Sequence, residues 1–230
     1  MKDKVIVSWS GGKDSMLSLY KVVHNDLMKP LGLLTTVTRE YDRVTLHGVR
    51  RSLMEMQASM LRMPLDLVYI PENCSMEEYE NIMRSALSKY KGKIEGFVFG
   101  DIFLEDVRKY REKMLALEGF KGYFPLWGRD TKELVLEFIK LGFKAIITSV
   151  DAEVLDSSYV GREINEEFIE NLPSNVDPAG EKGEYHSFVY DGPLFEKPVP
   201  IKVGEVVERV LGGKNFRKKF YFIDLLPANR

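Results

Sequence analysis

The sequence contains one cysteine, three histidines and no apolar run long enough to span a bilayer. With Cys74 alone, no disulfide can form within the chain and no zinc site can be built from several thiolates. A chain of this kind suits a reducing compartment, so we expect a cytoplasmic location. The strand-like pattern that begins at Val5 leaves no room for a signal or transit peptide, and none is expected.

The sequence also has no large excess of positive or negative charge. Lys and Arg total 33 against 35 Asp and Glu, which gives a formal net charge of -2. A near-neutral chain is a poor candidate for holding nucleic acid by charge, so direct nucleic-acid binding is not expected. The 230 residues, 44% of them hydrophobic, suffice for a sizeable core in one large domain or two modest ones. Composition leaves a homo-oligomer open.

Short β-branched runs alternate with helical patterns through the first half of the chain. Strands are predicted at 5–9, 31–37, 65–70, 96–100 and 123–127, and helices at 14–24, 48–62, 75–90 and 104–117. The strands are apolar throughout, as expected for a parallel sheet buried on both faces. Their order predicts an α/β fold with a Rossmann-like, doubly wound parallel sheet.

The second half has a different pattern. It contains a predicted helix at 131–141, a strand at 144–150, a helix at 162–171, a loop at 172–183 and a strand-rich tail, with YHSFVYDG, PIKVG and FYFIDLL as its strands. These elements predict a smaller C-terminal α+β domain. We therefore divide the chain into domains 1–128 and 129–230, with the boundary defined to about 20 residues.

The segment SGGKDS follows the first predicted strand and opens the first predicted helix. Backbone N–H groups at a helix start bind anions, and glycines let the backbone approach phosphate oxygens. This segment therefore predicts a nucleotide-phosphate site made by Ser10, Gly11, Gly12, Lys13, Asp14 and Ser15. The alternatives are an ordinary glycine-rich turn for the whole segment, and a helix cap for Asp14.

A second polar cluster, DPAGEKGEYHSFVYDGP, comes just before a predicted strand. Its Glu181, Glu184, Tyr185 and His186 form a mixture that suits a substrate with a cationic or carboxylate group. A solvated hairpin loop is the alternative. His47, in TLHGVRR, is a candidate for binding near the nucleotide, or else a loop histidine with local hydrogen bonds.

SGGKDS resembles the PP-loop, SGGxDS, of the N-type ATP pyrophosphatases, which bind ATP on a Rossmann-like (HUP-type) sheet and cleave it between the α- and β-phosphates. Taken with GDI at 100–102 and GEKGEYH at 180–186, nearly the whole chain resembles the diphthine–ammonia ligase (diphthamide synthetase) family. The first motif is shared across the superfamily and indicates the chemistry. The second is more particular to the family and indicates the substrate. Lys182 departs from the asparagine or glycine expected there.

The resemblance implies ATP-dependent amidation of diphthine, a modified histidine on translation elongation factor 2. The diphthine carboxylate would attack the α-phosphorus of ATP and release pyrophosphate, and ammonia would then displace AMP from the acyl-adenylate. ATP and Mg²⁺ are the implied cofactors. The implied roles are catalysis by Lys13, Asp14 and Glu184, nucleotide binding by SGGKDS with Gly100 and Asp101, metal binding by Asp14 and Asp101, and substrate binding by Glu181, Glu184, Tyr185, His186 and His47.

Two other functions stay open. One is another adenylating PP-loop enzyme, for tRNA modification or sulfur transfer, which the acidic balance and the isolated Cys74 disfavour. The other is a sensor that holds ATP or AMP without chemistry. The second polar cluster disfavours a sensor, because nucleotide binding alone does not require it.

Overall fold

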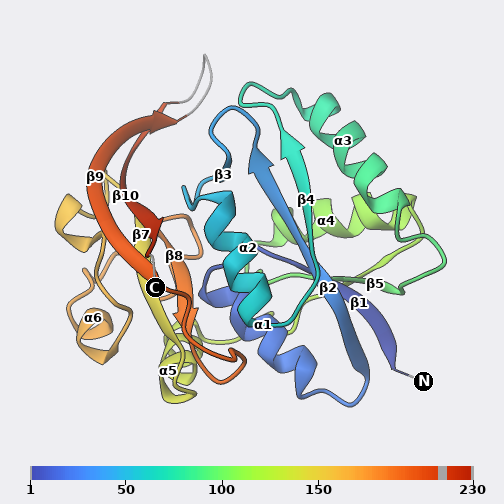
Figure 1. Cartoon of the computed structure of the whole chain (residues 1–230), viewed down its shortest axis with the longest axis horizontal. Helices are drawn as coiled ribbons and strands as arrows, with labels where there is room; N and C mark the ends of the chain where they lie inside the picture. Colours follow the sequence, from blue (N-terminus) through green and yellow to red (C-terminus); the bar gives the residue numbers. More distant parts are fainter. Residues whose placement is uncertain (1, 212–216, 229–230) are drawn as a thin grey trace.

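The structure is a computed structural model that describes residues 2–211 and 217–228. Figure 1 shows helices packed around a twisted sheet, with a second sheet beside them. The strands are β1 (Asp3–Ser8), β2 (Met28–Thr38), β3 (Arg43–Val44), β4 (Leu65–Ile70), β5 (Gly96–Val98), β6 (Lys121–Tyr123), β7 (Lys144–Asp151), β8 (Tyr185–Asp191), β9 (Ile201–Leu211) and β10 (Lys218–Pro227). The helices are α1 (Lys13–Val23), α2 (Arg51–Met60), α3 (Met76–Ser88), α4 (Glu105–Leu117), α5 (Thr131–Lys140) and α6 (Glu166–Glu170), with a 3₁₀ turn η1 (Ser157–Tyr159).

The first sheet has the order β3-β2-β1-β5-β6, and β4 also pairs with β2. The pairs of β1 with β2 and β5, of β2 with β4, and of β5 with β6 are parallel. Successive residues of β1 enter different cores, because Val5 and Val7 face one cluster and Ile6 the other. Burial on both faces confirms the predicted doubly wound α/β sheet.

Two details of this sheet differ from the prediction. The two-residue strand β3 pairs antiparallel with the end of β2, so the sheet is mostly rather than wholly parallel. The strand predicted at 123–127 is wrong in its extent, because β6 ends at Tyr123 and the chain then turns. Pro125 has no N–H to donate to a neighbouring strand, which disfavours extension of the ladder.

The second sheet is antiparallel, with the order β8-β7-β10-β9. Each predicted tail strand is present, and β9 and β10 are longer than predicted. The helix predicted at 162–171 is shorter: α6 begins after Asn165, whose side chain caps it by accepting the N–H of Phe168 at 2.8 Å. A smaller α+β part therefore follows the parallel sheet, as predicted.

The apolar core runs between the two sheets. One cluster contains Val7 of β1, Met16 of α1, Ile147 of β7 and Phe188 of β8, while a second lies on the α3 and α4 side of the first sheet. Figure 1 shows the same arrangement, with β7–β10 on the α1–α2 side and α3 beyond the first sheet. The division at residue 128 stays a prediction, since one core includes residues from both parts.

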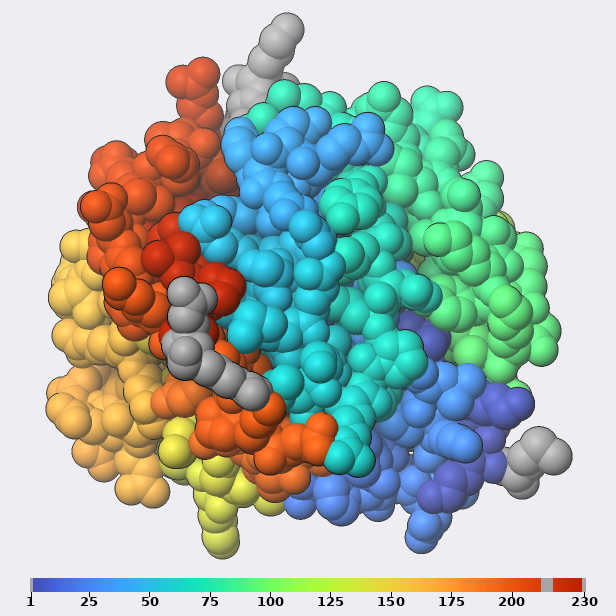
Figure 2. Space-filling view, viewed as in Figure 1, coloured from blue at the N-terminus to red at the C-terminus, as the bar shows by residue number. Residues whose placement is uncertain are grey.

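The loop between β3 and α2 lies against the second sheet. In Figure 2 the surface around α2 (cyan) adjoins the last strand (red) without a gap. Arg43 and Arg50 both pair with Asp224 of β10, at 2.9 and 2.7 Å. Ser149 of β7 donates to the carbonyl of Leu46 at 3.1 Å, which holds the neighbouring His47 in place. Within the described ranges, no helix is both long and apolar enough to cross a membrane.

Candidate functional site

The candidate phosphate loop is the SGGKDS segment, residues 10–15, where β1 turns into α1. Gly11 has φ of +77°, a conformation that side chains disfavour, and a Cβ there would lie 2.9 Å from atoms of Gln57 and Met54. Gly12 is the N-cap of α1 and has no side chain to satisfy the first N–H groups of the helix. The sequence therefore leaves these donors available to other groups.

Two of the N–H groups at this turn have acceptors. Gly12 donates to the hydroxyl of Ser10 at 3.3 Å, and Lys13 donates to the hydroxyl of Ser187 on β8 at 3.2 Å. In the described part of the chain, no acceptor is bonded to the N–H groups of Asp14 and Ser15. These two donors, at the positive end of the helix dipole, can bind an anion.

Lys13 connects the phosphate loop to the second motif. Its side chain is only 4% exposed, and Nζ donates to Oδ2 of Asp14 at 2.9 Å and to the carbonyl of Ala179. Nζ also lies 4.8 Å from the centroid of the Tyr185 ring. The helix-cap alternative for Asp14 is not realised, since its carboxylate bonds to Lys13 while Gly12 occupies the N-cap.

Two carboxylates fold the loop of residues 177–184 onto itself. Glu184, 6% exposed, accepts the N–H groups of Asp177 and Lys182 at 3.1 and 3.0 Å. Asp177 in turn accepts those of Ala179 and Glu181 at 3.0 and 3.1 Å. These bonds fix the backbone that presents the Ala179 carbonyl to Lys13. Both oxygens of Glu184 are thus occupied within the loop, a use that the sequence did not predict.

Glu181 joins this loop to the end of β5. Its Oε1 accepts the N–H groups of Ile102 and Phe103 at 2.7 and 3.3 Å. Burial raises the pKa of Glu181 to about 7, and the negative charges of Asp14 and Asp101 add to the effect. Burial likewise raises the pKa of Asp14, although the charge of Lys13 opposes it. Several carboxylates therefore share this site, and their mutual repulsion favours a cation among them.

Gly100 and Asp101 follow β5 at the carboxyl edge of the sheet. A Cβ on Gly100 would lie 2.9 Å from the backbone carbon of Asp14, so glycine permits the close approach of α1. Asp101 pairs with Arg111, whose Nε lies 2.8 Å from Oδ2 without hydrogen-bond alignment and whose Nη2 donates to Oδ1 at 3.3 Å. The predicted metal role of Asp101 must therefore compete with this arginine.

His47 and His186 meet beside the phosphate loop. Their ring centroids are 4.5 Å apart, and Nδ1 of His47 lies 3.4 Å from the carbonyl of Ser187. Burial lowers the pKa of His47 to about 4, and burial together with His47 lowers that of His186 well below its usual value. Both imidazoles are therefore neutral near pH 7, and each has one nitrogen that donates a hydrogen bond and one that accepts.

Among the described residues, no group of three or more His, Cys, Asp or Glu side chains could hold a metal ion. This donor set still fits Mg²⁺, which proteins commonly hold through one or two carboxylates plus substrate phosphates. Asp14 stands at the phosphate loop, and Asp101 is close enough to raise its pKa.

The structure thus brings the predicted residues of SGGKDS, GDI and GEKGEYH, with His47, around Lys13. Tyr185 is 1% exposed, and its ring faces the Lys13 ammonium rather than open space. Sequence reasoning missed Ser187 and Gln57. Ser187 directly follows His186 in the second motif, and Gln57 is the one glutamine of the chain, within an apolar helix pattern.

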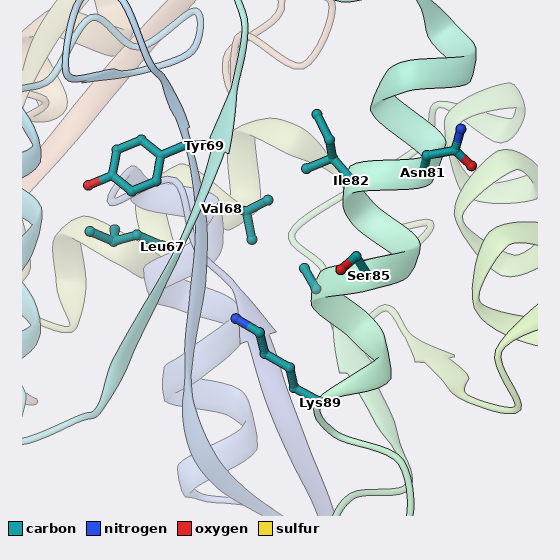
Figure 3. Close-up of a pocket in the computed structure, with 8 residues that line it drawn as sticks. Leu67, Val68, Tyr69, Asn81, Ile82, Ser85 and Lys89 are labelled. Atoms are coloured by element: carbon teal, nitrogen blue, oxygen red, sulfur yellow. The ribbon is translucent and has the colours of Figure 1, made fainter.

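A separate groove of about 430 Å³ lies between β4 and α3, away from the phosphate loop. Figure 3 shows Val68 and Ile82 facing each other across it, while Leu67 and Tyr69 point away from α3. Lys89 reaches into the groove from the end of the helix. Its lining contains none of the predicted site residues.

The chain matches two family models, the diphthamide synthase N-terminal domain over residues 3–122 and the diphthamide synthase C-terminal domain over residues 130–220. Diphthine–ammonia ligases of Bos taurus and Homo sapiens are each 26% identical to it, over 86% of this chain and 82% of theirs. That of Schizosaccharomyces pombe is 26% identical over 91% of this chain and 38% of its own length. A U34-tRNA thiolase structure from Methanococcus maripaludis aligns at 16% identity and a TM-score of 0.36, over 61% of this chain and 58% of that one.

Proposed function

Because the chain belongs to the diphthamide synthase family, a family of ligases, we propose that it amidates diphthine on translation elongation factor 2 to diphthamide. The reaction consumes ATP and ammonia and releases AMP and pyrophosphate. The observation that supports this proposal best is the contact of Lys13 with both motifs. One ammonium bonds to Asp14 of the phosphate loop and to Ala179 of the loop at 177–184.

In the first step we assign the diphthine carboxylate as the nucleophile. Its oxygen bonds to the α-phosphorus, and the bond from that phosphorus to the bridging oxygen of the β-phosphate breaks. We propose that the unbonded N–H groups of Asp14 and Ser15, at the start of α1, stabilise the charge that develops on pyrophosphate. A lysine ammonium has three donors, and Lys13 uses two of them in the structure, so its third can contact the leaving group.

We propose that Mg²⁺ is held by Asp14 and Asp101 together with the phosphates of ATP. When bound, it would neutralise charge on the triphosphate and favour departure of pyrophosphate. The ion pair of Asp101 with Arg111 makes Asp14 the more available ligand of the two. Whichever of the two carboxylates binds the metal, the N–H groups at the start of α1 are proposed to position the triphosphate.

In the second step ammonia attacks the acyl carbon, and AMP leaves with the electrons of the C–O bond. The proton that the nitrogen loses on becoming an amide goes to the departing phosphate oxygen. We propose that Glu181 binds ammonium and takes one of its protons on Oε2, because Oε1 already accepts two N–H groups. A pKa near 7 makes this carboxylate a stronger base than an ordinary glutamate. The neutral imidazoles of His47 and His186 are proposed to bind the substrate beside it.

We propose that Glu184 and Tyr185 do not contact the substrate and instead hold the loop of residues 177–184 in position. Glu184 holds the backbone of residues 177–184, and Tyr185 donates its hydroxyl to the carbonyl of Pro178 at 2.6 Å. With exposures of 6% and 1%, neither side chain has room to contact a large acceptor protein directly. Their proposed contribution is the position of Ala179 and Glu181.

The test is incubation with Mg-ATP, ammonium and diphthine-bearing elongation factor 2, followed by ³¹P NMR and protein mass spectrometry. We expect AMP, pyrophosphate and the mass change of a carboxylate converted to an amide. ADP with phosphate would refute the pyrophosphatase chemistry, and ATP binding without turnover would favour the sensor. Lys13→Ala should weaken adenylation, whereas Lys89→Ala, in the groove away from the site, should match the wild type.

Sulfur transfer remains the rival within the superfamily. Cys74 is half-buried and packs with the α3–α4 core, whereas α1 and β8, which flank the phosphate loop, pack in the other core. Desolvation raises the pKa of its thiol, which lowers its reactivity. If Cys74→Ser abolished turnover of any acceptor, this rival would replace the ligase.

A further inference from the structure

Gln57 is a polar residue in the apolar core. It is fully buried on α2, in the same turn as Leu53, Met54 and Ala58, which are buried as well. A buried amide destabilises a protein unless its donors and acceptor are hydrogen-bonded. The partners of Gln57 therefore explain why an amide is tolerated at this position.

The side chain of Gln57 bonds to three separate segments. Its Oε1 accepts the indole N–H of Trp9 at 2.8 Å. Its Nε2 donates to the carbonyls of Gly11 and Val189, at 3.0 and 2.6 Å. The orientation of the amide follows from these partners, because Trp9 can only donate and the two carbonyls can only accept.

These bonds control the peptide at the centre of the phosphate loop. The carbonyl of Gly11 accepts from Gln57 and also from the N–H of Val189, at 2.9 Å, so it is held toward the core. A peptide is planar and trans, so the N–H of Gly12 points the opposite way from that carbonyl. The Gly12 N–H bonds to the hydroxyl of Ser10 at 3.3 Å, within the same turn.

We propose that Gln57 is a positioning residue for the phosphate loop. It fixes the Gly11–Gly12 peptide that leads into α1, and so the position of the unbonded N–H groups of Asp14 and Ser15, and through Val189 it holds β8 against the same loop. The inference rests on the proposed function, since the bound anion is the triphosphate of ATP. No other side chain in the described ranges donates to the Gly11 carbonyl, so loss of Gln57 leaves only the Val189 N–H to hold it.

The test compares Gln57→Leu with Ala58→Gly in the full chain, with ATP and pyrophosphate affinities measured by calorimetry and melting temperature measured in parallel. Leucine keeps the volume and removes both donors, so affinity for both ligands should fall about tenfold or more. Ala58→Gly disfavours the same helix without touching the loop, and should lower the melting temperature while leaving affinity within about twofold.

Gln57→Glu provides a second readout and covers the case in which Gln57→Leu does not fold. The carboxylate keeps the acceptor for Trp9 but turns an oxygen toward the two carbonyls. A protonated carboxyl can donate to one of them, so ATP affinity should recover as pH falls, relative to wild type. Wild-type affinity in Gln57→Leu, or in a charged Gln57→Glu, overturns the proposal. Failure of the wild type to bind ATP would instead refute the proposed function.

Discussion

Because the pKa of Glu181 is raised in the folded protein, the free energy of unfolding should depend on pH. The carboxyl has an unfolded pKa of 4.5 and a folded pKa of about 7, because burial and nearby carboxylates disfavour its charge. Between these values the folded state binds more protons than the unfolded state. The stabilising effect of the protonated form is therefore complete below pH 4.5 and is lost as pH rises through about 7.

The size of this effect follows from the pKa. At 1.36 kcal/mol per pKa unit, a fully buried carboxyl with these two values would contribute ~3 kcal/mol. Glu181 is half-buried, so solvent screening reduces the expected contribution to roughly 1–2 kcal/mol. Glu181→Gln removes this contribution and keeps an oxygen to accept the N–H groups of Ile102 and Phe103.

The assay is urea unfolding of the wild type and Glu181→Gln at about pH 5 and about pH 8. From about pH 5 to about pH 8, the free energy of unfolding of the wild type should fall by roughly 1–2 kcal/mol more than that of the variant. The raised pKa of Asp14 acts in the same direction in both proteins, so the difference isolates Glu181 and its repulsion with Asp14. Glu170→Gln, at an exposed site on α6, should behave like the wild type. Equal pH dependence in all three proteins would refute the reasoning.

Two further substitutions test the loops. Glu184→Ala leaves the N–H groups of Asp177 and Lys182 without their acceptor and should lower the free energy of unfolding by ~2–4 kcal/mol in urea; a loss below about 0.5 kcal/mol would contradict the loop role. Gly11→Ala forces a side chain into φ of +77° against neighbours at 2.9 Å and should weaken ATP binding about tenfold or more by calorimetry. Gly92→Ala, at φ of +74° with no neighbouring atom within 4 Å, should leave ATP binding unchanged. If both variants lost the same ATP affinity, the loss would come from backbone strain rather than from the contacts of Gly11.

The fold was predictable where the pattern of burial is local. Strands apolar on both faces identify the parallel sheet, since a strand covered by helices on each side needs no polar face. Neither the two residues of β3 nor the early end of β6 has such a pattern. Pairing of β3 depends on the curl of β2, where Val37 and Thr38 contact both β3 and β4. Only tertiary structure brings these partners together.

The site was predictable only to the level of its motifs. Glycines, a lysine and a hydroxyl at a strand–helix junction have the same use in any sheet of this kind, so SGGKDS indicates a phosphate site by itself. The contacts of Ser187 and Gln57 with the phosphate loop span 174 and 46 residues of sequence, respectively. The sequence marks Ser187 only by its place beside the second motif and Gln57 only as a polar residue in an apolar helix pattern. Neither feature identifies the phosphate loop as the partner.

Lys13 shows why the two motifs belong to one site. A lysine buried to 4% exposure requires partners for its charge, and the phosphate loop offers only the Asp14 carboxylate. The remaining stabilisation comes from the Ala179 carbonyl and the face of Tyr185, both from the second motif. Without that loop, the ammonium would keep one carboxylate partner and would leave two of its N–H donors unbonded. The loop that we assign to the substrate is thus also what permits a buried cation at the proposed phosphate site, so we expect nucleotide binding to depend on the arrangement of residues 177–184.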